Sequence, residues 1–355
     1  MANIDLRGLT HPNGAAKFDD IIYKNFIANT PLNNVFKIME GVKNGGKVVG
    51  VKPFRILGKI SQGCNPEYDN SLMPTVEKTW NIAEWVIPQE ICYDDLKGTI
   101  VDEVLNTGIN SANVIDTRYY KEIIEPGIID GIEKLHSRLA FFGSVTMSVD
   151  ELQETDDLEY FNLIDGIWKQ IFDAVAKGTI KNTAIAANNK TTIAQQMSAF
   201  TAGSGDAVKL VHSILTEAPI GLRQASNKVL YMTQALFDAY AADKQAKFVG
   251  SESQWETLES GITTGKINGI DVMVLPDWDY NIQNFLKNTT NAGAYDKPYR
   301  AILTVKDNLL LGTESDGDFK TFIADFDAKN QVNWILAKNT LGAMVHFDEL
   351  VHVAY

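Results

Sequence analysis

Residues 47–60 read KVVGVKPFRILGKI, residues 61–75 read SQGCNPEYDNSLMPT, and residues 76–87 read VEKTWNIAEWVI. The first and third stretches are rich in β-branched and aromatic residues that alternate with polar ones, which is typical of strands. The middle stretch is dense in Gly, Asn, Asp, Ser and Pro, which favour turns. We therefore predict two strands joined by a long polar tip. Because an isolated two-stranded ribbon is only marginally stable in water, this hairpin needs a surface to lie against.

A long helix is predicted after the hairpin, starting near Asp116. Pro126 lies within its apolar stripe and predicts a kink, and Gly143 predicts its end. The stripe recurs at helical spacing over roughly five turns. Its members are Tyr120, Ile124, Ile128, Ile132, Leu135 and Leu139.

The remainder of the chain mixes both kinds of element. Residues 150–245 are mainly helical by their apolar spacing, with KVLYM (228–232) as a buried strand. Asn268-Gly269 between apolar runs is a strong hairpin signal. Further strands follow up to Tyr355, with a turn expected at Leu341-Gly342. The fold class is therefore α+β.

The composition limits the possible functions. The chain has 355 residues, which favours two lobes with extensions, and a net charge of −13 argues against sequence-specific nucleic-acid binding. Cys64 and Cys92 do not make a disulfide framework, and a reducing compartment is expected. The N-terminus does not resemble a secretion signal, and no apolar run is long enough for a membrane span.

We find no residues to assign to catalysis, a cofactor or a metal. The stretch AGSGDAVKL (202–210) matches neither phosphate-binding glycine pattern, so Ser204 or Asp206 is expected to cap a helix. The acidic residues between 314 and 327 do not follow the calcium-loop pattern. The five histidines form no metal motif. We therefore expect a protein that is not an enzyme.

Three segments resemble the major capsid proteins of tailed bacteriophages. The first is the hairpin leading into IPQEICYDDL (87–96) and the helix ending LAFFG (139–143). The second is VLYMTQALFDAY (229–240), and the third is INGIDVMVLP (267–276). The likeness covers most of the chain, but it is one of element order and loose patterns.

The resemblance implies the Johnson fold, also called the Hong Kong ninety-seven type. In that family the hairpin is the E-loop, and a long spine helix runs through the peripheral domain. The implied divisions are an N-terminal arm (1–46), the E-loop hairpin (47–83), the peripheral domain (84–148), the axial domain (149–328), and closing strands that return to the peripheral domain (329–355).

The implied function is a subunit that assembles with itself, as hexamers and pentamers, into the icosahedral shell around a phage genome. The implied partners are a separate scaffolding protein, a portal, a decoration protein, and packaged DNA through non-specific proximity; no membrane is involved. The implied location is the virion, after assembly in the host cytoplasm. The apolar side chains expected to contact a neighbouring subunit are Phe54, Ile56, Trp80 and Ile82. A crosslink from Lys52 or Lys59 to Asn333 or Asn339 is not expected.

Two alternatives remain open from the sequence. A bacterial nanocompartment (encapsulin-like) shell would share the fold and enclose an enzyme in place of DNA. A cytosolic α/β enzyme with an unrecognised site is the second alternative.

Overall fold

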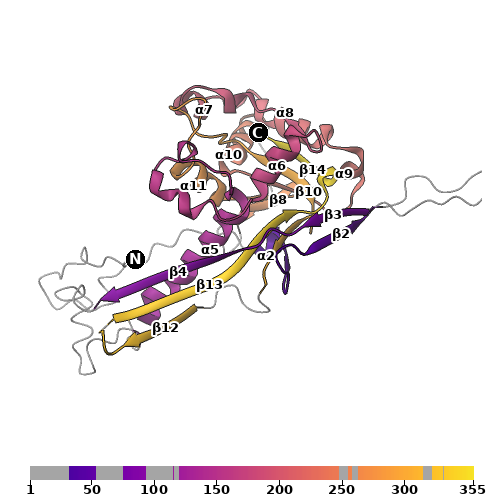
Figure 1. The fold of residues 1–355 in the computed structure, drawn as a ribbon. Helices are drawn as coiled ribbons and strands as arrows, with labels where there is room; N and C mark the ends of the chain where they lie inside the picture. The colour runs from indigo at the N-terminus through magenta and orange to yellow at the C-terminus, as the bar shows by residue number, and fades with distance from the viewer. Residues whose placement is uncertain are drawn as a thin grey trace, which may run out of the picture.

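The computed structural model describes residues 32–52, 75–92, 115, 120–247, 255–257, 263–314, 322–330 and 332–355. Figure 1 shows a lobe of helices and strands from which a long sheet extends on one side and a two-stranded ribbon on the other.

The lobe is built on a seven-stranded sheet. Its strands, in spatial order, are β5 (Lys181–Thr183), β14 (Val351–Ala354), β10 (Ala301–Val305), β6 (Lys228–Met232), β9 (Ile270–Val274), β8 (Thr263–Ile267) and β7 (Trp255–Thr257). The predicted strand KVLYM is β6, and four of its five residues are buried. The longer helices beside this sheet are α6 (Ile167–Ala176), α8 (Asp206–Glu217), α10 (Gln234–Lys247) and α11 (Pro276–Asn284).

The extended sheet is organised around one strand. Its members are β1 (Lys37–Met39), β11 (Leu309–Gly312), β13 (Val332–Val345), β12 (Phe322–Asp327) and β4 (Ala83–Cys92). β13 is 14 residues long and pairs with β4 and β12 along its first part and with β11 along its last part. It thereby joins the projecting sheet to the lobe (Figure 1).

The remaining elements are short. They are α2 (Leu32–Val35), the ribbon strands β2 (Lys47–Val51) and β3 (Thr75–Thr79), α7 (Ile193–Met197), α9 (Ile220–Gln224), and 3-10 helices at Val149–Glu151, Thr155–Tyr160, Ala186–Asn189 and Asp348–Leu350.

The predicted long helix begins as a π-helix, Tyr120–Ile124, and continues as α5, Glu125–Phe142. Pro126 is the second residue of α5 and follows the π-helical turn directly, so it lies where the helix changes from π to α geometry. The kink expected at Pro126 stays a prediction. α5 packs against β13, α6 and α11.

Gly143 follows the last residue of α5, as expected, but its φ of −56° is not left-handed. Crowding explains the glycine instead, because a Cβ there would lie 2.6 Å from the Ile164 carbonyl oxygen.

The Asn268-Gly269 turn is confirmed between β8 and β9. Both residues have positive φ, 52° and 79°, as a type I′ turn requires. The turn expected at Leu341-Gly342 is wrong, because β13 runs straight through it. Gly342 permits close packing, since a Cβ there would lie 2.8 Å from the Asn81 carbonyl oxygen.

The start of α8 is capped from a distant helix. Its N-cap is Gly205, with φ of 80°. The carboxylate of Asp243, which belongs to α10 and is fully buried, accepts hydrogen bonds from the Gly205 and Ala207 amides at 3.1 and 2.9 Å. Ser204 accepts a hydrogen bond from the amide of Asp206, the first residue of α8, but the N-cap position belongs to Gly205. The expectation that Ser204 or Asp206 is the N-cap is therefore corrected, and Asp243 supplies the cap from a distance.

Two strands differ from the expected divisions of the chain. β12 lies inside the range assigned to one axial domain (149–328), yet it pairs with β13 in the extended sheet. β14 was expected to return to the peripheral domain with the closing strands (329–355), yet it pairs with β10 and β5 in the lobe. The reason is that strand pairing depends on neighbours in space. β12 pairs with the strand that follows it, β13, whereas the 3-10 helix Asp348–Leu350 separates β14 from β13 and β14 pairs in the other sheet.

Asp279 on α11 makes the stability of the lobe pH-dependent. Its carboxylate accepts hydrogen bonds from the Gln234 and Ala235 amides at the start of α10, and burial raises its pKa to about 7. The raised pKa means that the folded state holds a proton that the unfolded state releases between about pH 4 and 7. Its contribution to stability is therefore largest below that range and is lost as pH rises to 7.

We expect the wild-type free energy of unfolding to fall with rising pH between 5 and 7, relative to Asp279→Asn, by at most about 1.4 kcal/mol per pH unit. Urea unfolding at several pH values measures this difference. Parallel curves for the two proteins would contradict the assignment.

Candidate assembly surface and cationic pocket

The two-stranded ribbon carries an exposed apolar face. β2 and β3 pair antiparallel, with Val49 opposite Glu77 and Val51 opposite Thr75. Val49 and Val51 are each 54% exposed, although isolated valines on a free ribbon are costly to leave in water. This ribbon face, defined by Val49 and Val51, is a candidate contact surface.

The opposite side of the ribbon packs against the segment from Val345 to Asp348 of the same chain. A Cβ on Gly50 would lie 2.5 Å from the Phe347 ring, so only glycine permits this approach. The Lys78 Nζ donates to the Val345 carbonyl at 2.6 Å and to the Asp348 carboxylate at 2.5 Å. These contacts set the direction in which the ribbon leaves the lobe.

Trp80 and Ile82 do not belong to the exposed face. They are 2% and 5% exposed and form a small core with Leu310 and Met344. The expectation that they contact a neighbouring subunit is therefore corrected, because the strand ends at Thr79 and the chain then turns inward. Phe54 and Ile56 lie outside the described residues.

A second apolar surface lies on the extended sheet. In register across β12, β13 and β4, Ile323 is opposite Leu336, which is opposite Pro88. Ile323 is 64% exposed, and Val86 on β4 is 52% exposed. The other face of β13 is buried against the core. The exposed face is mixed, because the Lys338–Glu84 ion pair lies on it beside Val86 and Ile323.

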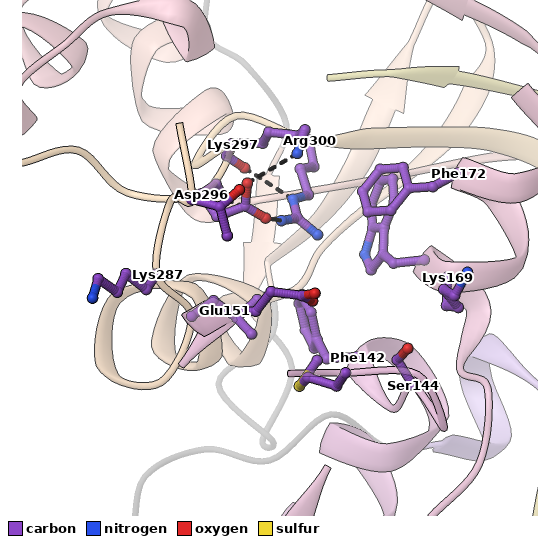
Figure 2. Close-up of a pocket in the computed structure, with 13 residues that line it drawn as sticks. Phe142, Ser144, Glu151, Lys169, Phe172, Lys287, Asp296, Lys297 and Arg300 are labelled. Carbon is purple, nitrogen blue, oxygen red and sulfur yellow. Dashed lines mark hydrogen bonds and ion pairs between the residues drawn. The ribbon is translucent and has the colours of Figure 1, made fainter. Parts of the chain in front are cut away.

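A cavity of about 180 Å³ lies in the lobe, beside the loop between α11 and β10 (Figure 2). Its apolar wall includes Phe142, Met147, Trp168, Phe172 and Leu286.

Charged side chains line the rest of the cavity. The cations are Lys169, Lys287, Lys297 and Arg300, and the acids are Glu151 and Asp296. In Figure 2 the Glu151 and Arg300 side chains point toward the same space.

Arg300 is the most constrained of these groups, since its side chain is only 1% exposed. Its Nη2 donates to the Asp296 carboxylate at 2.7 Å, and its Nε donates to the Lys297 carbonyl at 2.9 Å. Its guanidinium carbon lies 5.0 Å from the centre of the Trp168 ring. Burial lowers the pKa of Arg300, and Asp296 opposes that effect. Burial acts to raise the pKa of Asp296, but Arg300 and Lys297 outweigh it and hold that pKa below its usual value.

No family model and no curated protein sequence matches this chain. Solved structures do match. The capsid structure of cyanophage P-SCSP1u aligns with a TM-score of 0.53 and 12% identity, covering 99% of this chain and 98% of that one.

The capsid of an empty GTA particle aligns with a TM-score of 0.54 and 12% identity, covering 98% and 95% of the two chains. A procapsid of satellite phage P4 that includes the size determination (Sid) protein aligns with a TM-score of 0.51 and 10% identity, covering 90% and 92%.

This chain has the phage capsid fold. The alignments run over nearly its whole length, so the α+β architecture is shared as a unit and not as one fragment. The resemblance inferred from the hairpin, the long helix and the Asn268-Gly269 turn is confirmed at the level of the fold.

Two buried histidines of this capsid-fold chain, His352 and His136, lie in separate surroundings. His352 is 1% exposed, and its Nε2 is 2.9 Å from the Thr183 hydroxyl, which donates to the Glu217 carboxylate at 2.7 Å. A Thr–His–Glu group resembles a nucleophile with its base, but Thr183 is 8% exposed and its hydroxyl is committed to Glu217. His136 is buried against the Trp85 ring.

The described residues contain no group of three or more His, Cys, Asp or Glu side chains placed to hold a metal ion. None of their helices combines the length and the apolar character that crossing a bilayer requires.

We expect Trp80→Ala to lower the free energy of unfolding by about 3–5 kcal/mol, because it leaves a cavity beside Leu310 and Met344. Denaturant unfolding measures the loss. The exposed control Val49→Ala should change stability by less than about 0.5 kcal/mol. Equal effects of the two substitutions would show that Trp80 is not part of a core.

Proposed function

We propose that the chain is a structural subunit, copies of which assemble into an icosahedral capsid shell. The observation that carries the proposal is the full-length likeness to capsid chains of a cyanophage and a GTA particle. A shared fold alone does not fix function, so the exposed surfaces supply the second argument.

The exposed surfaces suit a subunit better than a solitary protein. The ribbon face leaves Val49 and Val51 in solvent on the paired strands β2 and β3, and the extended sheet leaves Val86 and Ile323 in solvent. Most proteins cover the apolar side chains of projecting strands, and those that leave them exposed commonly use them as interfaces. Copies that meet head to tail form a ring when the rotation from each copy to the next adds up to a full turn.

Within this proposal the parts have the roles that the resemblance implies. α5 is the spine helix, the seven-stranded lobe is the axial domain, and the ribbon begins the E-loop that contacts a neighbouring copy. The N-terminal arm and the E-loop tip (residues 53–74) lie largely outside the described residues. Hexamers and pentamers of this chain, a separate scaffolding protein, a portal and a decoration protein are the proposed partners.

The net charge of −13 is consistent with a wall that does not hold packaged DNA tightly. The proposed location is the virion, after assembly in the host cytoplasm. A structural role is favoured over a catalytic one because the shared fold belongs to shell proteins. The similar structures come from phage and GTA particles, which favours a capsid over a nanocompartment shell.

We expect Val49→Lys combined with Val51→Lys to abolish shell formation and leave the subunit folded, because both side chains already face solvent. Negative-stain microscopy and sedimentation velocity report assembly, and circular dichroism reports folding.

The matched control is Ile220→Lys on α9 in the lobe, where Ile220 is 71% exposed. Shells at wild-type yield from the double variant would overturn the role of the ribbon face. A wild-type protein that sediments only as a species of about 39 kDa under all assembly conditions would overturn the shell itself.

A further inference from the structure

The dipeptide Asn-Gly occurs in two turns of the described chain, in different surroundings. One is Asn44-Gly45, just before the ribbon, and the other is Asn268-Gly269, between β8 and β9. A third, Asn13-Gly14, lies outside the described residues. Asparagine is a chemically labile residue, and a following glycine has no Cβ to block attack of its nitrogen on the asparagine side chain. The surroundings therefore decide which of the two described asparagines can react.

The Asn44 pair is held by hydrogen bonds at the base of the ribbon. The Gly45 amide donates to the Trp80 carbonyl at 2.9 Å, and the Asn44 Oδ1 accepts from the Ile82 amide at 3.2 Å. Both groups that would have to meet are therefore fixed to other partners. Trp80 and Ile82 are themselves buried, so breaking these bonds disturbs the small core beneath the ribbon.

The Asn268 pair lacks these constraints. Asn268 and Gly269 are both exposed, and the Gly269 amide makes no hydrogen bond to any group in the described part of the chain. They form a two-residue turn beyond the last strand pair, Ile267 with Ile270. Exposed turn tips open at little cost in free energy, so the Gly269 nitrogen can rotate toward the Asn268 side chain while the strands below stay paired.

A proton donor lies beside the group that must leave. The His212 Nε2 on α8 is 3.5 Å from the Asn268 Nδ2, and both side chains are exposed. This distance is at the outer limit of a hydrogen bond, and exposed side chains have room to shorten it. An amide nitrogen leaves as ammonia only after it gains a proton, which an imidazole within reach supplies. The Asn44 side chain has no histidine among its hydrogen-bond partners in the described ranges.

We propose that Asn268 is a site of spontaneous covalent modification, at which the side-chain amide becomes a carboxylate. The Gly269 nitrogen loses its proton to water and attacks the Asn268 Cγ, so a cyclic imide forms and the Cγ–Nδ2 bond breaks. The departing nitrogen takes a proton from His212 and leaves as ammonia. Water then opens the imide at either carbonyl, which gives an aspartate or an isoaspartate at position 268. The neutral contact with His212 is thereby replaced by a charged one.

The test is incubation of the unassembled full-length chain at neutral pH, followed by digestion and peptide mass mapping at mildly acidic pH. Conversion of the amide to the acid is followed over time at positions 44 and 268. We expect Asn268 to react faster than Asn44 by about tenfold or more, because two hydrogen bonds, each worth roughly two- to tenfold, must first break at Asn44. Comparable rates, or no conversion at Asn268, would overturn the proposal.

Urea provides the control for the contribution of the fold. In the unfolded chain both dipeptides are free of their native partners, so the two rates should converge. If Asn268 stayed faster to the same extent in urea, the neighbouring sequence would explain the difference, and the protection assigned to the Asn44 hydrogen bonds would be wrong.

Two variants on α8 test the role of His212. His212→Gln removes the proton donor and should slow conversion at Asn268 by about threefold or more, which is less than the roughly hundredfold effect of an enclosed general acid because water competes. Lys209→Gln changes an exposed side chain one turn away, where Lys209 pairs with Asp206, and should leave the rate unchanged. Circular dichroism reports that both variants stay folded. An unchanged rate in His212→Gln would overturn its role as the donor.

Discussion

The structure depends on the continuous pairing of β13. This strand carries alternately buried residues along its first part, and its last part enters the core of the lobe beside β11. Because the same strand also pairs with all of β4, the projecting sheet cannot rotate freely against the lobe. Leu341 and Ile335, both nearly fully buried, fix the register, since a slip by one residue would turn them to solvent.

The ribbon and the cavity both depend on this arrangement. Trp80 and Ile82 close the base of the ribbon by packing against Leu310 and Met344, which lie on strands that β13 organises. Arg300 stands just before β10, and its ion pair with Asp296 keeps the preceding loop against the aromatic wall. The candidate contact surfaces are therefore attached to a rigid framework, although they lie at its edges.

Local signals in the sequence predicted much of the fold. The Asn268-Gly269 turn needs only two residues that tolerate positive φ, and the β6 strand needs only a short apolar run. Distant contacts were not predictable. Asp243 caps a helix whose capped amide is 38 residues away, and no local pattern marks it. Glycine is common both in turns and where two chain segments pack closely, so Gly342 alone does not distinguish the two. The close approach of the Asn81 carbonyl, which shows that Gly342 serves packing, is a contact between distant residues.

The same limit applies to the candidate sites. Strand alternation placed Trp80 and Ile82 on one face but did not reveal that their partners lie far along the chain. Val49 and Val51 belonged to the predicted hairpin, yet their exposure depends on Gly50 and Phe347 meeting on the other side. The cavity joins residues from α6, the 3-10 helix Val149–Glu151 and the loop before β10, so no single stretch indicates it.

Two kinds of contact hold the base of the ribbon, apolar packing and ion pairs, and they respond differently to dissolved salt. The contacts of Trp80 and Ile82 are apolar and do not respond to ionic strength. The Lys78–Asp348 and Lys52–Glu349 pairs are partly exposed, so dissolved ions weaken them. Rising salt would therefore weaken the ion pairs that hold the ribbon and leave the apolar contacts of Trp80 and Ile82 unchanged. The ribbon would then change its angle to the lobe while its base stays packed.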